Sequence, residues 1–397
     1  MSLFKSLSND LGKNIYILTI YSFLTGVGRT LYATLFPLYL YSIRYSMTDI
    51  GIIVTISNLI IAFLIPFLGV LVDYYGRKPF IIFTGLLLAA SLYLAGSYKV
   101  YWVLILSYSL SIFSFMAGQP ARGALLAESV SPERMGEAFG LVTSTFFIGR
   151  VLIPPLSGYI ADNIGYSNAF YMGSIVALFG SIIFSVYGLE TLKERVTPRL
   201  NELLNMLKPK RELIWLYIGC MIDRFGWALW MSLLNAYLMD VYEISATGVG
   251  LMNSLLGISS MLTQYLAGRL IDKIGYIRGL ILSEFTGFIA SLFLGSTYIV
   301  YGAALALIIV GISISLWTPS YNNAVSLNTR PEYRALEYSK VNSYRVFISV
   351  PAPYLGGYLY DMISPSTPFL LSSLVMFTAT IFFYIVGRRY VWVRNLS

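Results

Sequence analysis

Apolar runs of about 20 residues recur along the whole 397-residue chain, and they limit what it can fold into. Hydrophobic residues make up 57% of the sequence and charged residues only 12%, which leaves too little polar surface for a soluble domain. In a bilayer only helices and closed barrels satisfy every backbone polar group, and these runs lack the alternating polarity of barrel strands. We therefore expect twelve transmembrane helices, at residues 14–41, 49–72, 79–97, 101–127, 138–161, 168–189, 213–239, 247–271, 278–297, 299–326, 337–360 and 367–388.

The cations between these runs predict the orientation in the membrane. Most of the 27 Lys and Arg residues fall on the side that holds both termini, whereas only Arg44 and Lys99 lie in loops on the opposite side. By the positive-inside rule, both termini are cytoplasmic. The same distribution accounts for the formal net charge of +8 without a nucleic-acid partner. We expect a multi-pass protein of the plasma membrane that works as a monomer.

The second half of the chain repeats the first with one constant shift of 199 in residue number. The shift relates Gly51 to Gly250 and Asp162 to Asp361. Further pairs at this spacing are Pro120 and Pro319, Pro132 and Pro331, Glu133 and Glu332, Pro154 and Pro353, Gly158 and Gly357, and Tyr159 and Tyr358. One ungapped shift over most of each half predicts two copies of a six-helix unit. We place the halves at 1–189 and 213–397, with a cytoplasmic linker at 190–212.

The linker is the longest polar stretch of the chain and is rich in Lys and Arg. Within it, leucines fall at helical spacing, at Leu200, Leu203, Leu204 and Leu207. This pattern indicates an amphipathic helix on the inner leaflet of the membrane. A basic tether that only helps to set the orientation is the alternative.

The loop between the second and third predicted spans, Gly69–Pro79, carries the most specific motif, G-x-x-x-D-x-x-G-R-K-P. Asp73 can accept hydrogen bonds from free backbone N–H groups of the turn, and Gly76 permits the positive φ of a sharp reversal. Arg77 and Lys78 place two cations at the membrane edge. The second half repeats the aspartate and its flanking glycines at Gly268, Asp272 and Gly275.

This motif, in this position, resembles the signature loop of major facilitator superfamily transporters. The resemblance implies an all-α membrane fold with twelve transmembrane helices in two pseudo-symmetric six-helix bundles and a substrate site between them. It also implies a cytoplasmic latch that holds the outward-open state. The latch candidates are the signature residues Gly69, Asp73, Gly76, Arg77, Lys78, Gly268, Asp272 and Gly275, together with Glu128 and Arg134. Loop charges that only set the topology are the alternative.

Ionisable side chains inside the spans are costly, so each is a functional candidate. The candidates within the spans are Arg29, Arg122, Arg150, Arg224, Arg345, Asp223 and Glu284. After the 199 shift, Arg224 falls one helical turn from Arg29, and Arg345 falls one turn from Arg150. By resemblance to the family fold, Arg29 and Arg224 would face a shared site near the midplane.

The candidates for substrate binding are Arg29, Arg224, Arg150, Asn235, Gln119, Asn322 and Asn323. If protons are coupled, Asp223 is the first candidate and Glu284 the second, since the chain has no histidine. A structural ion pair between Arg29 and Asp223 is an alternative without a substrate contact. Arg122 and Arg345 lie near the cytoplasmic ends, where long side chains snorkel or brace turns. Glu284 is expected to pair with a loop cation.

We interpret the chain as a secondary active transporter that moves a small organic solute, expected to be anionic, by alternating access. No G-x-x-x-x-G-K-[ST] loop occurs, so a proton or substrate gradient would drive it. With no histidine and one cysteine, Cys220, the spans hold no catalytic constellation, and we expect no enzyme activity, metal or cofactor. A broad-specificity multidrug exporter that is coupled to protons is one alternative. A membrane sensor that does not transport is another.

Overall fold

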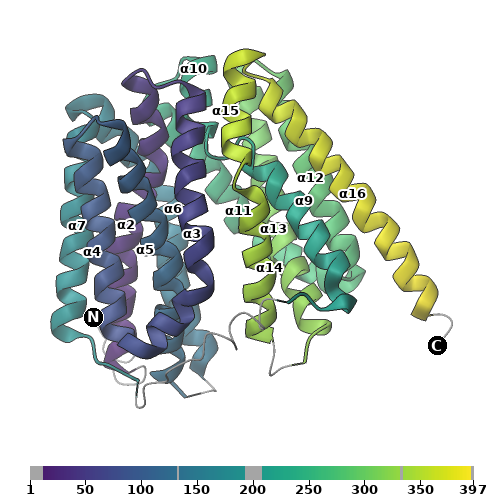
Figure 1. Cartoon of the computed structure of the whole chain (residues 1–397), viewed down its shortest axis with the longest axis horizontal. Coiled ribbons are helices and arrows are strands. Elements are labelled where there is room, and N and C mark those ends of the chain that lie inside the picture. Colours follow the sequence, from purple (N-terminus) through teal and green to yellow (C-terminus); the bar gives the residue numbers. More distant parts are fainter. Residues whose placement is uncertain (1–11, 132–133, 193–207, 331–333, 395–397) are drawn as a thin grey trace. The chain divides into compact units, whose positions relative to one another are not determined.

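The computed structural model describes residues 12–131, 134–192, 208–330 and 334–394, and this part of the chain is helical throughout, without strands (Figure 1). The expected amphipathic helix of the linker lies outside the described residues. By internal contacts the chain forms two compact units. Unit 1 comprises Met1–Tyr39, Ser57–Leu203 and Ser245–Gly250, and unit 2 comprises Leu40–Ile56, Leu204–Ile244 and Leu251–Ser397.

The first half of the chain supplies six long helices, close to the expected spans: α2 (Lys13–Ser42), α3 (Met47–Tyr75), α4 (Arg77–Ser97), α5 (Tyr101–Glu128), α6 (Met135–Ile164) and α7 (Tyr166–Tyr187). Two of these helices are preceded by a glycine with a positive φ. Gly76 (φ 102°) precedes α4, and Gly165 (φ 91°) precedes α7. A residue with a Cβ is strained at such angles, so glycine is the residue that allows these abrupt reversals.

The second half has more breaks than expected. Its helices are α9 (Ile214–Ala228), α10 (Leu234–Tyr242), α11 (Ala246–Ile274), α12 (Tyr276–Ser296), α13 (Val300–Leu327), α14 (Arg334–Ser349), α15 (Ala352–Met362) and α16 (Thr367–Arg394). The expected span 337–360 is divided at Val350 and Pro351, because proline has no N–H to donate to the preceding turn. The expected span 213–239 is divided at 229–233, where Gly356 of α15 packs directly on the carbonyl of Leu229.

Eight of the described helices are long and apolar enough to cross a membrane. They are the helices at the expected spans 2–6, 9, 10 and 12. The four expected spans outside this group include α2, α9 and α14, which carry Arg29, Asp223 and Arg345. The helices α9 and α14 fall outside it because they have only 15 and 16 residues, since the expected spans that contain them are interrupted. The arrangement of twelve spans in two bundles stays a prediction.

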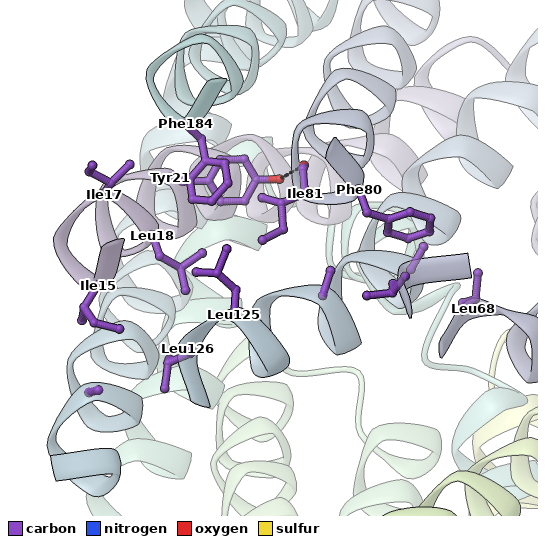
Figure 2. Packing of buried hydrophobic residues seen from close by; sticks show 14 residues of the cluster. Ile15, Ile17, Leu18, Tyr21, Leu68, Phe80, Ile81, Leu125, Leu126 and Phe184 are labelled. Carbon is purple, nitrogen blue, oxygen red and sulfur yellow. Dashed lines mark hydrogen bonds between the residues drawn. The ribbon is translucent and has the colours of Figure 1, made fainter. Parts of the chain in front are cut away.

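The core of unit 1 is built on α2, α4, α5 and α7. Tyr21 of α2 is 1% exposed, packs against Phe184 of α7 with ring centroids 5.2 Å apart, and donates a hydrogen bond of 2.8 Å to the carbonyl of Ile81 of α4 (Figure 2). Leu18, Leu125 and other apolar side chains complete this cluster. The buried tyrosine satisfies its hydroxyl on a backbone carbonyl, as a polar group in an apolar core must.

Close glycine contacts join α6 to the start of α11 within unit 1, and α3 to α15 within unit 2. A Cβ on Gly250 would lie 2.3 Å from the carbonyl oxygen of Pro154. At the repeat-related position, a Cβ on Gly51 would lie 2.3 Å from the carbonyl oxygen of Pro353. Such approaches of two backbones are possible only without a side chain, so both contacts depend on glycine.

Candidate functional site

Arg29 lies on α2 next to the face that packs on α7. Gly28 approaches the carbonyl of Gly173 on α7, so this face of α2 is closed by backbone packing. The next residue, Arg29, points toward α5, where its guanidinium carbon lies 3.3 Å from the centroid of the Phe115 ring. Within the described part of the chain, the Arg29 guanidinium makes no ion pair. A guanidinium stacked on an aromatic face keeps its N–H donors in its own plane, pointing outward from its edges.

A second arginine shares this region of unit 1. The charge of Arg122 on α5 repels that of Arg29, and Arg122 interacts with the Tyr21 hydroxyl. Gly118, one turn before Arg122, leaves room for its guanidinium, because a Cβ there would lie 3.2 Å from Nη1 of Arg122. Tyr108 is the other polar group that acts on Arg29. The region therefore concentrates positive charge beside aromatic rings.

The remaining candidates for substrate binding lie on other helices and differ in exposure. Arg150 on α6 is half-buried, and Gln119 on α5 is exposed. Asn235 is 8% exposed and accepts a hydrogen bond of 2.9 Å from the Asn253 amide, which fixes its orientation. On α13, Asn322 is exposed and Asn323 is half-buried.

In unit 2, Asp223 of α9 pairs with Arg345 of α14. Nη2 of Arg345 lies 2.8 Å from Oδ2 of Asp223, and Asp223 is only 2% exposed. The Arg345 guanidinium also lies over the rings of Trp317 and Tyr321 of α13, at 5.0 and 5.5 Å from their centroids. The charge of Arg224, the neighbour of Asp223, acts on the same carboxylate. The partner of Asp223 is thus Arg345. Arg345 forms a buried ion pair and does not extend toward the membrane surface, as the sequence had suggested.

No cation from a described loop pairs with Glu284 of α12. Its side chain is 1% exposed, and neither carboxyl oxygen has a hydrogen-bond partner among the described residues. The groups that act on it electrostatically are Asp223 and Arg345. The expected pairing with a loop cation is therefore wrong, because the side chain turns into the protein.

The packing of α9 and α14 fixes the pair in place. A Cβ on Gly219 would lie 2.3 Å from the Phe383 ring of α16, so α9 lies close against α16. The start of α14 is held by Glu337, which is fully buried, accepts a short hydrogen bond from the Tyr217 hydroxyl, and lies 3.6 Å from Nζ of Lys210 and 3.7 Å from Nζ of Lys340. Removing one partner of such a buried network is costly, so these contacts anchor the first turn of α14.

The signature loop places its charges around one helix end. Arg77 is 8% exposed and its Nη2 lies 3.0 Å from Oε1 of Glu128. The carboxylate of Glu190 accepts hydrogen bonds from the backbone N–H groups of Arg77 (3.1 Å) and Lys78 (3.0 Å), the first residues of α4. Arg134 instead pairs with its neighbour Glu137, at 3.1 Å.

The remaining signature residues are Asp73 and Gly69 and those of the second copy of the loop. The side chain of Asp73 lies outside the described residues, and so does the environment of Gly69 in α3. In the second copy, Gly275 has a φ of 85°, Gly268 is half-buried and Asp272 is exposed.

Sequence reasoning missed Glu190, which caps α4, and the aromatic residues that contact the arginines, Phe115 and Trp317. An acid at the first residue after the sixth span was the available signal for Glu190. No sequence signal identified the two aromatic residues, because aromatic residues are abundant throughout the chain, with 32 Tyr and 24 Phe.

The model of the Major Facilitator Superfamily matches residues 18–350 and again residues 216–395. The chain belongs to the Major Facilitator Superfamily. It is similar to the multidrug resistance protein MdtG of Proteus mirabilis, with 26% identity over 97% of this chain and 98% of that protein. It is also similar to the multi-drug resistance efflux pump PmrA of Streptococcus pneumoniae, with 26% identity over 68% of this chain and 70% of that protein.

A solved member of the superfamily shares the fold. The crystal structure of a bacterial homolog to the human lysosomal transporter Spinster superposes with a TM-score of 0.78 at 13% identity, and covers 95% of this chain and 97% of that one. This protein is therefore a Major Facilitator Superfamily transporter with several apolar helices, in a membrane. Proteins of this superfamily are in general transporters of small molecules and not enzymes.

Proposed function

We propose that this protein is a secondary active exporter of small organic solutes that carry a negative charge. The two six-helix halves, 1–189 and 213–397, would rock about a site near the midplane of the plasma membrane, with both termini in the cytoplasm. The protein would work as a monomer, and a proton gradient would supply the driving force. The direction of transport is inferred from the relatives that are named efflux pumps.

The position of Arg29 is the observation from which we infer that the substrate is negatively charged. Its guanidinium is stacked on Phe115, so its N–H donors at the edge stay free for two parallel hydrogen bonds to one carboxylate or phosphate. Arg122 adds a second positive charge, and no carboxylate of the described residues neutralises either guanidinium. Charges of one sign inside a membrane protein are costly unless a counter-ion arrives. A bound organic anion would supply that charge.

The polar candidates on other helices are proposed as further residues that bind the substrate. Arg150, Arg224, Asn235, Gln119, Asn322 and Asn323 are the side chains that we propose for further contacts with the substrate. Arg345 is not among them, since Asp223 already neutralises it.

A broad-specificity exporter is the second candidate. The observation that favours it is the aromatic surface beside Arg29, with Phe115 and Tyr108, because flat apolar rings accept many ligands of different shape. The similarity to proteins named for multidrug resistance supports it as well. The two candidates differ in the charge that the preferred substrate carries.

Transport of two fluorescent probes from cells or proteoliposomes separates the candidates. Carboxyfluorescein is an organic anion, and ethidium is an organic cation of similar size. We expect export of carboxyfluorescein, and we expect Arg29→Lys to impair it nearly as much as Arg29→Ala, because an ammonium cannot form the two parallel bonds. Arg388→Lys is the matched control, since Arg388 also lies over an aromatic ring, that of Tyr384, at an exposed position.

Three outcomes would decide the question. A loss of carboxyfluorescein export in both Arg29 variants, with normal export in Arg388→Lys, supports the anion site. Export of ethidium in preference to carboxyfluorescein would leave the broad-specificity exporter as the better assignment. Full activity of Arg29→Lys would show that only a positive charge is needed at this position.

A further inference from the structure

We propose that Glu284 is the proton-binding group of this transporter, in a site that it forms with the ion pair between Asp223 and Arg345. The three residues come from α12, α9 and α14, all within unit 2. The site is separate from Arg29 and Arg122, which belong to unit 1. The inference rests on the proposed function only where it links the proton to transport.

The first argument is that no described residue donates a hydrogen bond to the Glu284 carboxyl group, and that the side chain it meets is another acid, Asp223. Both of its oxygens are buried without a hydrogen-bond partner among the described residues, and the side chain is 1% exposed. A buried carboxylate in this condition loses its hydration and gains no hydrogen bond in return. A carboxylic acid, which is neutral, has a much smaller desolvation penalty. In the conformation described here, Glu284 therefore holds a proton.

The second argument is the charge of the surrounding groups. On α9, Asp223 repels an ionised Glu284, Arg224 acts on Asp223, and the Cys220 thiol lies within reach of the cluster. On α14, Arg345 attracts Glu284 but is engaged by Asp223.

Among the described residues, the other elements packed against α12 add no further charged group that acts on Glu284. On α13, Tyr321 faces Arg345, and the Ser313 hydroxyl donates to the carbonyl of Ser283. On α16, Met376 packs one turn away, near Gly287. Thus, within the described part of the chain, Arg345 is the cation that can stabilise an ionised Glu284, and in this conformation it is paired with Asp223.

The third argument comes from the internal repeat. The shift of 199 relates Glu284 to Gly85 and Cys220 to Tyr21. In the first half, the space beside Gly85 is filled by the hydroxyl groups of Ser181 and Tyr21, 2.2 and 2.9 Å from a Cβ placed on Gly85. The Tyr21 hydroxyl donates to the carbonyl of Ile81 (Figure 2). The fold therefore fills this position with neutral groups in one copy. A carboxyl group in the other copy is not needed for packing, which favours a role in function.

These groups form a switch with two states. With the proton on Glu284, Arg345 pairs with Asp223 alone, as in this structure. When the O–H bond of Glu284 breaks, the proton passes to water and the carboxylate keeps the electron pair. Arg345 then faces two carboxylates and is drawn toward Glu284, which pulls on α14. Binding and release of one proton thereby change which carboxylates attract Arg345. This changes the forces between α12, α9 and α14 and couples the proton to the movement of these helices.

Infrared spectroscopy of the purified protein tests proton binding directly. A protonated carboxylic acid has a carbonyl stretch that a carboxylate and a glutamine lack. We expect this band in the wild type at neutral pH, its loss in Glu284→Gln, and its retention in Glu243→Gln, where an exposed carboxyl group is removed as the control. A wild type without the band, or a band that survives in Glu284→Gln, would overturn the proposal.

A transport experiment tests the coupling. In proteoliposomes with an imposed pH gradient, we expect the gradient to increase carboxyfluorescein transport several-fold in the wild type and to have no effect in Glu284→Gln. Should Glu284→Gln not fold, the double variant Glu284→Gly with Cys220→Tyr copies the neutral packing of the first half and has the same expected phenotype. Dependence on the gradient in either variant contradicts the proposal. If the wild type does not transport carboxyfluorescein, the proposed function fails, while the infrared result still decides whether Glu284 holds a proton.

Discussion

Asp162 and Asp361, which are related by the internal repeat, make the same contact in the two units. The Asp162 carboxylate accepts hydrogen bonds from the backbone N–H groups of Ala246 (3.1 Å) and Thr247 (2.8 Å) at the start of α11. The Asp361 carboxylate accepts them from the N–H groups of Met47 (3.3 Å) and Thr48 (2.7 Å) at the start of α3. Each threonine hydroxyl donates a further bond, of 2.5 Å, to the same carboxylate.

These contacts stabilise helix starts that lie far away in sequence. The first N–H groups of a helix have no partner within it, and the positive end of the helix dipole attracts a carboxylate. Asp162 and Asp361 therefore cap a helix that belongs to the other half of the chain. Because the contact occurs twice at related positions, we regard it as a feature of the fold and not as an accident of one loop.

The first prediction concerns these caps. We expect Asp162→Asn and Asp361→Asn each to lower the free energy of unfolding by roughly 1 kcal/mol, since the neutral amide loses the attraction to the helix dipole and one acceptor oxygen. Thermal unfolding in detergent would measure the loss, with Glu243→Gln as a control at an exposed carboxyl group. Unchanged unfolding temperatures in both variants would show that the caps contribute nothing.

The second prediction concerns the close approach at Gly356. A Cβ there would lie 1.7 Å from the carbonyl oxygen of Leu229, and a backbone atom cannot move aside as a side-chain tip can. We expect Gly356→Ala to reduce the yield of folded protein severely. Gly140→Ala is the matched control, because a Cβ at Gly140 meets no atom within 4 Å and alanine favours a helix by roughly 0.5–1 kcal/mol over glycine. Size-exclusion profiles of both variants would check this, and a well-folded Gly356→Ala would contradict the packing.

The third prediction concerns the signature turn. Gly76 has a positive φ, and a Cβ there would lie 2.6 Å from Oε2 of Glu190, the residue that caps α4. Gly76→Leu should therefore insert into the membrane but transport poorly, because it disturbs both the turn and its cap. Gly165→Leu is the control, since Gly165 has a similar φ but no atom within 4 Å of a Cβ. Equal transport by the two variants would mean that backbone strain of roughly 1–3 kcal/mol, common to both, is the whole effect.

The fourth prediction concerns topology. Cys220 is fully buried, so a Cys220→Ala background leaves no reactive thiol. In that background we expect a cysteine at Ser245 to react with an impermeant thiol reagent from outside intact cells. A cysteine at Ser131 should react only after the membrane is opened. Labelling of Ser131 in intact cells would reverse the orientation that the Lys and Arg distribution predicts.

The sequence by itself determined the features that depend on local pattern. Apolar runs of helical length set the positions of the helices, and single glycines such as Gly76 and Gly275 marked where they reverse. The internal repeat was visible because equivalent turns and close contacts need the same small residues in both halves. Membership in the Major Facilitator Superfamily followed from the signature loop and is confirmed by the family match.

Only the tertiary structure decided which charged groups meet. The partner of Asp223 is Arg345, more than a hundred residues away, and Glu284 turns inward, where no described residue donates a hydrogen bond to it. Helical spacing places a residue on a face, but the rotation and tilt of each helix, which follow from packing such as that of Gly219 on Phe383, decide what that face meets. For the same reason Asp162 and Asp361 could be recognised as a repeated pair from the sequence, while the helix starts that they cap could not.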